Sequence, residues 1–292
     1  MSVRSGFRPG WTLGMNVNKD QDLQALLKAQ AILLDWDGCL AFANRPHAAA
    51  LEFMGRYRSR IVIVSNNSTL LPGDISEILA RSGVLLDKSR ILLAGYEALR
   101  LVSVAEPRPT LVLGPPRMKA LAKRLGVELV RDRAEVVVLL RDTRFSYAKL
   151  ERTVKALSKG ARLVVANPDL SHPGAEGEPV PETGALLAAI AACVDLGTID
   201  MSVIGKPNAH LFLRACETLG ARPEKSLMIG DNPVTDIAGA EKLGMTSILV
   251  SPGSEVCLRD LIAPLDQRKP SAQNRLIDKT SKVCCRVSVA RS

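Results

Sequence analysis

The feature that most constrains the fold is a series of short apolar runs, each ending at a small or polar residue and followed by a helix-like stretch. There are five such runs, at residues 31–34, 61–64, 203–204, 227–229 and 247–250. Strands that alternate with helices are typical of parallel sheets with right-handed crossovers. We therefore predict an α/β fold with a doubly wound, Rossmann-like parallel sheet that binds its ligand beyond the carboxyl ends of the strands.

Residues 66–202 form a stretch much longer than the usual connection between two such strands. Within it, three more strand-and-helix repeats are expected, with strands at 110–113, 136–140 and 163–166 and helices at 118–125, 147–157 and 183–194. We expect an N-terminal extension over 1–28, a core domain over 29–105 and 201–264, an inserted α/β domain over 106–200, and a loose basic tail over 265–292.

The charge of the chain is concentrated at its end. Residues 267–292 carry seven Lys and Arg residues against one Asp, which accounts for +6 of the net charge of +9. This segment is polar and lacks basic residues interleaved with aromatic ones, so we interpret it as a solvated terminus and expect no nucleic-acid binding.

The cellular setting is predicted from what the sequence lacks. No run of about 20 apolar residues could cross a membrane, and residues 1–28 lack the apolar block of a secretory signal. The six cysteines contain no CxxC pair, which favours free thiols in a reducing compartment. We expect a cytoplasmic protein with no membrane partner.

Two pairs of carboxylates follow two of the apolar runs. Asp35 and Asp37 come directly after the first run, and Asp231 and Asp236 follow the fourth. An Asx turn or a helix cap could account for either pair alone. Four carboxylates at one sheet edge are unfavourable unless they bind something positive, and a divalent ion with oxygen ligands meets that need. The sequence therefore predicts a Mg²⁺ site.

Polar groups of the opposite kind follow two other runs. Ser65 and Asn66 begin a loop with hydroxyl, amide and backbone donors, and Lys206 follows Gly205. Donors of this kind facing a metal site are suited to the oxygens of a phosphoryl group. We expect Ser65, Asn66 and Lys206 to bind phosphate.

The combination resembles the haloacid dehalogenase (HAD) superfamily, whose phosphatases carry four motifs in this order at these strand ends. The residues similar to the four motifs are Asp35–Gly38, Ser65 with Asn66, Lys206, and Asp231 with Asp236. The long insertion and the loop that begins at Asn167 resemble the α/β-capped branch containing p-nitrophenyl, pyridoxal and phosphoglycolate phosphatases. The resemblance covers residues 31–253 and implies a HAD core with an inserted α/β cap domain.

The resemblance also implies a mechanism. Asp35 would be the nucleophile that forms an aspartyl-phosphate, and Asp37 would act first as acid and then as base. The side chains of Asp35 and Asp231, with the backbone carbonyl of Asp37, would hold Mg²⁺. Asp236 would act from outside this group by orienting Lys206 or the waters on the metal.

A loop of the inserted domain is expected to determine specificity. It contains Asp169 and His172, and the pyridoxal phosphatase branch has a similar Asp-x-x-His-Pro stretch whose histidine contacts the pyridine ring. A solvated surface histidine is the alternative reading.

The sequence thus predicts a Mg²⁺-dependent phosphatase of a small phosphorylated metabolite, with pyridoxal 5′-phosphate as the favoured substrate. Phosphoglycolate and glycerol phosphate are the alternatives. A non-catalytic relative that binds a phosphorylated ligand is a reading from another class, and phosphomutase chemistry stays open. A homodimer formed through the cap is a further expectation.

Overall fold

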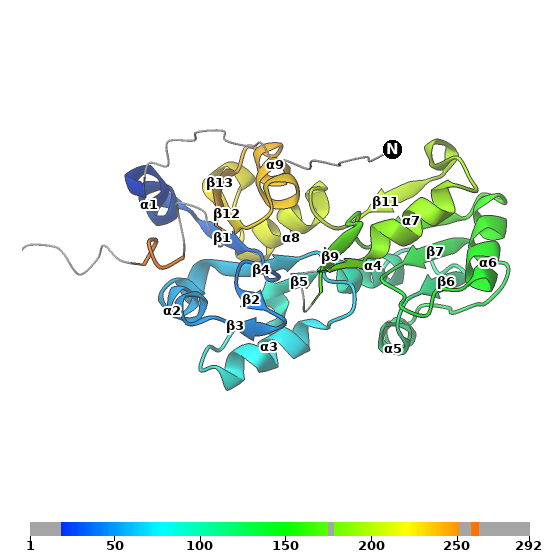
Figure 1. Ribbon diagram of the computed structural model, residues 1–292, viewed down its shortest axis with the longest axis horizontal. Helices are drawn as coiled ribbons and strands as arrows, with labels where there is room; N and C mark the ends of the chain where they lie inside the picture. Colours follow the sequence, from blue (N-terminus) through cyan, green and yellow to red (C-terminus); the bar gives the residue numbers. More distant parts are fainter. Residues whose placement is uncertain (1–18, 175–177, 251–257, 263–292) are drawn as a thin grey trace, which may run out of the picture.

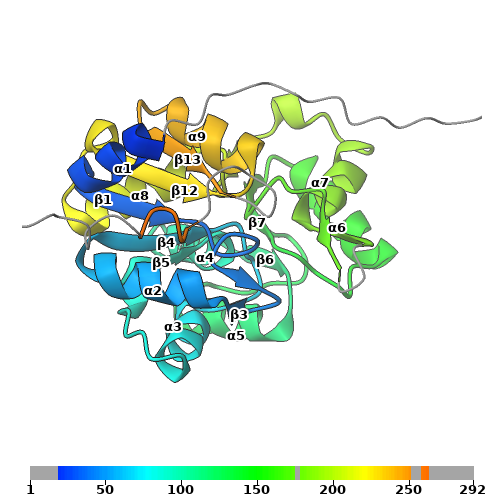
Figure 2. The same cartoon turned by 60° about the vertical axis from the view of Figure 1, so that its left-hand side comes forward.

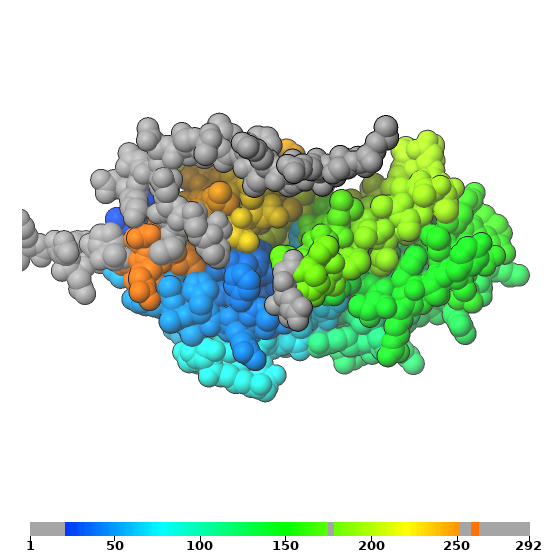
Figure 3. All heavy atoms as spheres, in the orientation of Figure 1, coloured from blue at the N-terminus to red at the C-terminus, as the bar shows by residue number. Residues whose placement is uncertain are grey.

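The computed structural model describes residues 19–174, 178–250 and 258–262. Two parallel sheets lie beside each other along the long axis of the molecule (Figure 1). In the space-filling view, the green atoms of the part built on the smaller sheet adjoin the blue and cyan atoms of the part built on the larger one (Figure 3).

The larger sheet has five strands in the order β13-β12-β1-β4-β5. All neighbouring strands are parallel. The strands are β1 (Ala31–Leu34), β4 (Ile61–Ser65), β5 (Ile91–Leu93), β12 (Ser226–Gly230) and β13 (Thr246–Leu249). The predicted doubly wound α/β class is confirmed.

Helices cover both faces of this sheet because successive side chains of a strand point to opposite sides. Along β1, Ile32 and Leu34 pack in one buried cluster and Leu33 packs in another. The first cluster includes residues of α1 (Lys19–Lys28), α2 (Ala48–Tyr57) and α3 (Pro72–Arg81). The second includes residues of α4 (Ala94–Ser103), α8 (Ala209–Leu219) and α9 (Ala238–Glu241). Figure 2 shows α2 and α3 on the side opposite α8 and α9.

The helix α1 falls within the expected N-terminal extension, and it is part of the folded structure. Leu26 of α1 is fully buried in the same cluster as Phe53 and Leu79. The guanidinium of Arg60 donates to the carbonyls of Leu26 and Ala29, which ties the end of the helix to the sheet. Residues 19–28 therefore contribute to the core.

The order of the strands places the ligand site. From β1 the chain moves outward to β4 and then β5, whereas β12 lies on the other side of β1 and is followed by β13. The direction of winding changes between β1 and β12, and a crevice forms at the carboxyl ends of strands at such a switch point. The loops after β1 and β12 border this crevice.

The smaller sheet has four parallel strands in the order β11-β8-β7-β6. They are β6 (Thr110–Leu113), β7 (Val136–Leu139), β8 (Arg162–Val165) and β11 (Met201–Val203). The helices between them are α5 (Pro116–Arg124), α6 (Tyr147–Leu157) and α7 (Thr183–Ala191). The three strand-and-helix repeats predicted in the insertion are confirmed.

One strand belongs to a different sheet from the one expected. The sequence pattern predicted Val203 and Ile204 as a strand of the larger sheet, and this is wrong, whereas the domain limit at residue 201 stays a prediction. Met201–Val203 pairs with Leu163–Val165 of β8, and the amide of Ile204 donates to the carbonyl of Val165. A strand of three residues contains no local information about its partner, so non-local pairing decides. The other domain limits stay predictions.

Two short hairpins lie near the crevice. The strands β2 (Ala41–Phe42) and β3 (Arg45–Pro46) pair in the loop after β1. The strands β9 (Ser171–Pro173) and β10 (Pro179–Pro181) pair in the loop between β8 and α7. The second hairpin lies in the loop that was expected to determine specificity. His172 is in β9, and Asp169 precedes it.

Some sequence-based expectations lie outside the described residues. The basic tail at 265–292 does, as do Cys257, Cys284 and Cys285, whereas Cys39, Cys193 and Cys216 are free thiols. None of the helices within the described ranges is long and apolar enough to cross a membrane.

We expect Gly95→Ala to destabilise the fold and Gly55→Ala to stabilise it, although both glycines are in helices. A Cβ on Gly95 would lie 2.6 Å from the Cα of Ser68, whereas a Cβ on Gly55 would meet nothing within 4 Å. Overpacking against backbone costs about 1–3 kcal/mol. Alanine in an open helical position gains roughly 0.5–1 kcal/mol over glycine. Urea unfolding measures both, and equal effects would contradict this account of the packing.

Candidate active site

Polar side chains from both sheets meet at the switch point of the larger sheet. Asp35 follows β1 and Asp231 follows β12. Ser65 is the last residue of β4 and begins the next loop. Lys206 enters from the smaller sheet, three residues after the end of β11. The crevice is therefore built by the carboxyl ends of strands from two sheets.

The buried ammonium of Lys206 lies between two buried carboxylates. Its Nζ atom is 2.5 Å from Oδ1 of Asp35 and 2.6 Å from Oδ1 of Asp236. The side chains of Lys206 and Asp236 are 2% and 1% exposed. At this depth each charge requires a partner, and Lys206 supplies one to both carboxylates.

The pKa values of this group reflect burial and mutual charge. Burial raises the pKa of Asp35 well above its usual range, and the Lys206 ammonium opposes that shift. Burial alone would lower the pKa of Lys206, but the carboxylates of Asp236 and Asp35 outweigh it and raise this pKa. Lys206 therefore stays protonated at neutral pH.

Asn66 holds the backbone of Lys206 from both sides. Its Oδ1 atom accepts from the Lys206 amide at 2.7 Å, and its Nδ2 atom donates to the Lys206 carbonyl at 2.9 Å. A Cβ on Gly205 would lie 2.6 Å from Oδ1 of Asn66, so only glycine allows this approach. Asn66, which was predicted to contact phosphate, thus positions Lys206.

Asp37 lies at the mouth of the crevice, with its side chain exposed and next to the Ser65 loop. The Ser65 hydroxyl donates to Oδ2 of Asp37 at 3.2 Å and accepts from the Asn67 amide at 3.0 Å. Although the carboxyl reaches solvent, desolvation by the crevice walls raises its pKa, and the hydrogen bond from Ser65 opposes this shift. This arrangement is suited to a group that exchanges protons with a ligand.

Three carboxylates could hold a metal ion. Oxygen atoms of Asp35, Asp231 and Asp236 lie within 4.8 Å of one another. The sequence-based set contained Asp37 where this group has Asp236. Burial, and then the charge of Asp236, raise the pKa of Asp231, and the Lys206 ammonium opposes this shift only in part. Oxygen donors with excess negative charge fit a hard divalent cation.

Gly38 gives Asp231 its room. The backbone of Gly38 has a φ of +92°, and a Cβ there would lie 2.3 Å from Oδ2 of Asp231. The turn after β1 thus leaves the space that the carboxylate occupies, so the residues present fit the expected metal.

The predicted specificity residues lie on the smaller sheet's side of the crevice. Oδ2 of Asp169 accepts from Nδ2 of Asn66 at 2.9 Å. His172 lies in β9, with its Nδ1 atom 2.9 Å from Oε1 of Glu182. The charge of His172 also contributes, after Ser65, Asn67 and Lys206, to opposing the rise in the pKa of Asp37. The loop is therefore close to the predicted catalytic pair.

Several residues around the crevice were missed from the sequence. Asn167, which donates from Nδ2 to the Asn66 carbonyl at 2.7 Å, follows β8, and Arg141 follows β7. Glu182, which contacts both Arg141 and His172, precedes α7. The strand-end rule applied to the larger sheet holds equally for the smaller parallel sheet and points to Asn167 and Arg141. It does not point to Glu182, which follows no strand of that sheet.

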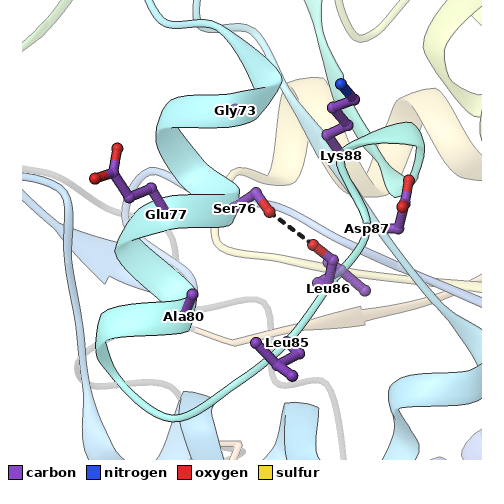
Figure 4. A pocket seen from close by; sticks show the side chains of 8 residues that line it. All are labelled: Gly73, Ser76, Glu77, Ala80, Leu85, Leu86, Asp87 and Lys88. Atoms are coloured by element: carbon purple, nitrogen blue, oxygen red, sulfur yellow. Dashed lines mark hydrogen bonds between the residues drawn. The ribbon is translucent and has the colours of Figure 1, made fainter.

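A surface hollow elsewhere has none of this chemistry. It has a volume of about 510 Å³ and lies between α3 and the segment before β5 (Figure 4). Ser76 in its wall donates to the carbonyl of Leu86 at 2.9 Å. Its wall includes none of the predicted site residues, so the crevice is the candidate active site.

The chain matches two family models. Residues 32–128 match a model described as haloacid dehalogenase-like hydrolase, and residues 203–263 match a HAD-hydrolase-like model. Together they include every residue predicted for catalysis, phosphate and metal.

Several curated proteins of similar sequence are phosphatases by name. Chronophin of Homo sapiens is 30% identical over 246 residues, which cover 77% of this chain and 82% of that protein. Dihydroxyacetone phosphatase of Corynebacterium glutamicum is 28% identical over 225 residues, covering 76% and 80%. Among solved structures, 4-nitrophenylphosphatase from Thermotoga maritima superposes with a TM-score of 0.72 at 27% identity, covering 82% of this chain and 98% of that one.

Mg²⁺ should raise the melting temperature of the wild-type protein, and Asp231→Asn should remove that increase. Without metal, Asp231→Asn should be at least as stable as wild type, because it removes a poorly compensated charge. A ligand that binds only the folded state stabilises it by mass action. Thermal melting with and without Mg²⁺ measures this.

Asp132→Asn is the control for this measurement, because Asp132 is 75% exposed and paired with Arg152 in the other part of the molecule. It should keep the full Mg²⁺ shift. An unchanged shift in Asp231→Asn would contradict the proposed metal position.

Proposed function

The chain belongs to the haloacid dehalogenase-like hydrolases and is a phosphate-monoester hydrolase, and from this premise we propose a Mg²⁺-dependent phosphatase that works through an aspartyl-phosphate on Asp35. The observation that carries the proposal is the contact of the buried Lys206 ammonium with Asp35 at the switch point. Lys206 holds one carboxylate oxygen of Asp35 in a fixed position. The carboxylate then lies at the crevice that a phosphoryl group would enter.

In the first step, a carboxylate oxygen of Asp35 attacks phosphorus while the bond from phosphorus to the leaving oxygen breaks. Asp37 donates its proton to that oxygen, so the leaving group departs as an alcohol. The Ser65 hydroxyl, the amides of its loop and the Lys206 ammonium stabilise the negative charge on the transferring oxygens.

In the second step, Asp37 takes a proton from water as the water attacks the aspartyl-phosphate. The bond between phosphorus and Asp35 breaks, phosphate leaves and the carboxylate is restored. The side chains of Asp35 and Asp231 and the carbonyl of Asp37 would hold Mg²⁺, whose positive charge would offset the repulsion between the carboxylate nucleophile and the phosphate.

The substrate is a small phosphorylated metabolite, and pyridoxal 5′-phosphate is the favoured one. The support is His172, which lies in the β9 hairpin beside Glu182 and acts on the charge of Asp37. Phosphoglycolate and glycerol phosphate are the alternatives, and the name dihydroxyacetone phosphatase shows that a relative acts on a short phosphorylated chain.

Asp35→Asn should abolish phosphate release and leave the fold intact, since it removes the nucleophile but keeps the side-chain volume. Asp37→Asn should inactivate the enzyme as well, because it cannot transfer protons. Phosphate release with Mg²⁺ and p-nitrophenyl phosphate measures both, with melting curves as the folding control.

Turnover retained by Asp35→Asn, once deamidation back to Asp is excluded by mass, would overturn the covalent mechanism. A phosphomutase would return phosphate to an isomeric product instead of water. Product analysis distinguishes the two reactions.

His172→Ala should raise KM for pyridoxal 5′-phosphate by roughly tenfold, the equivalent of one hydrogen bond. Hydrolysis of p-nitrophenyl phosphate should change little, because that substrate has no ring nitrogen to form a hydrogen bond with the imidazole. A loss on both substrates would indicate damage to the hairpin. Unchanged kinetics on pyridoxal 5′-phosphate would remove the reason to favour it.

A further inference from the structure

Residues that follow three strands of the smaller sheet contact the loop that begins at Ser65. After β8, Asn167 donates to the Asn66 carbonyl at 2.7 Å. After β11, the backbone of Lys206 is held by the Asn66 side chain. After β7, the amide of Arg141 donates to the Ser68 hydroxyl at 3.0 Å. Whatever follows these strands is thus fixed relative to the phosphate position.

Arg141 is the charged residue that follows β7 and contacts this loop. Its backbone is anchored on Ser68, and its side chain is 25% exposed. Nη1 is 3.5 Å from Oε1 of Glu182, a distance longer than a good hydrogen bond. The guanidinium is therefore paired with Glu182 only at the long end of the ion-pair range.

The hydrogen-bonding capacity of Arg141 is largely unused. Its Nε atom is buried and has no hydrogen-bond partner within the described part of the chain. A guanidinium offers five N–H donors in a planar fork that matches carboxylate-like oxygens. A buried donor without a partner is unfavourable, so its presence beside a binding crevice points to a ligand acceptor.

Glu182 does not fully compensate Arg141. The same Oε1 atom is 2.9 Å from Nδ1 of His172, so two potential cations share one carboxylate oxygen. Burial raises the pKa of Glu182, although Arg141 and His172 oppose the shift. The cluster of Arg141, His172 and Glu182 can therefore accept further negative charge.

We propose that Arg141 is a specificity-determining residue that binds an anionic oxygen on the leaving group of the substrate. The inference rests on the proposed phosphatase function and adds a substrate class to it: phosphate esters whose leaving group carries a carboxylate or an ionised phenol. Phosphoglycolate has the first group and pyridoxal 5′-phosphate the second, whereas glycerol phosphate and dihydroxyacetone phosphate have neither.

The position of the cluster explains why it contacts the leaving group and not the phosphate. The phosphate is assigned to Ser65 and Lys206, which contact Asp37 and Asp35. Arg141 and His172 instead lie around Glu182, which precedes α7. An anionic leaving group would also face the carboxylates of Asp37 and Asp231. Like charges at short range repel, and Arg141 offsets that repulsion.

The test compares substrates that differ only in the anionic oxygen. One pair is phosphoglycolate and 2-hydroxyethyl phosphate, and the other is pyridoxal 5′-phosphate and its 3-O-methyl ether. Arg141→Met should lower kcat/KM by roughly ten- to hundredfold for the anionic member of a pair, as for a lost charged hydrogen bond. The neutral member should change by less than about twofold, and Arg141→Lys should restore part of the loss. The effect should be mainly on KM, because the contact does not change during reaction.

Arg144→Met is the matched control. Arg144 lies three residues further along in the same loop, is exposed, and was not assigned to the crevice. It should leave both pairs unchanged, and melting curves should show that all variants are folded.

The outcomes separate the two possible sources of the anion. A selective loss in the phosphoglycolate pair identifies a carboxylate, and a selective loss in the pyridoxal pair identifies a phenolate. Equal changes in the anionic and neutral members of both pairs would overturn the assignment of Arg141 while leaving the phosphatase proposal intact.

A measurement without turnover separates failure of the inference from failure of the proposed function. Calorimetry on Asp35→Asn, with and without Arg141→Met, compares the binding of phosphoglycolate and 2-hydroxyethyl phosphate. Selective weakening of phosphoglycolate supports the role of Arg141 even if wild type releases no phosphate. Equal binding of both ligands to both variants would overturn it.

Discussion

The ammonium of Lys206 between Asp35 and Asp236 is the interaction on which the rest of the site depends. All three groups are buried, so removing Lys206 would leave two carboxylates without a counter-charge in a medium of low dielectric, whereas removing one carboxylate would leave a neutral pair. Because the folded-state pKa of Lys206 is raised, the stabilisation from its pairing is complete below the ordinary lysine value. It is lost only as pH rises through the raised pKa. Lys206 therefore keeps its charge around neutral pH.

This interaction also joins the two sheets. Lys206 leaves the smaller sheet at the end of β11, yet its charge is paired in the larger sheet and its backbone is clamped by Asn66. Any rigid displacement of β11 would strain the contact with Asp35. The same edge of the smaller sheet positions Arg141 against Ser68, so the positions of Asp35 and Arg141 both depend on how the two sheets are placed.

Much of this site follows from one rule about strand ends. Asp35, Ser65 and Asp231 were predicted from short apolar runs followed by polar residues, since local hydrophobic pattern is enough to mark the end of a buried strand. The assignment of residues 203–204 failed because which sheet a three-residue strand joins depends on pairing with β8, which is absent from the local pattern. Arg141 was not predicted because the strand-end rule was applied to the larger sheet alone. Glu182 could not be predicted because charged loop residues are usually solvated, and only its contacts in space distinguish it.

The central claim is that Asp35 is the nucleophile that attacks phosphorus and that Lys206 holds its carboxylate in place. The most direct measurement is rapid acid quenching during turnover, followed by mass spectrometry of the peptide that contains Asp35. The account predicts the mass of one phosphoryl group on Asp35, labile to hydroxylamine and missing from Asp35→Asn. Steady phosphate release with no covalent phosphate at any quench time, or with the group on another residue, would contradict it.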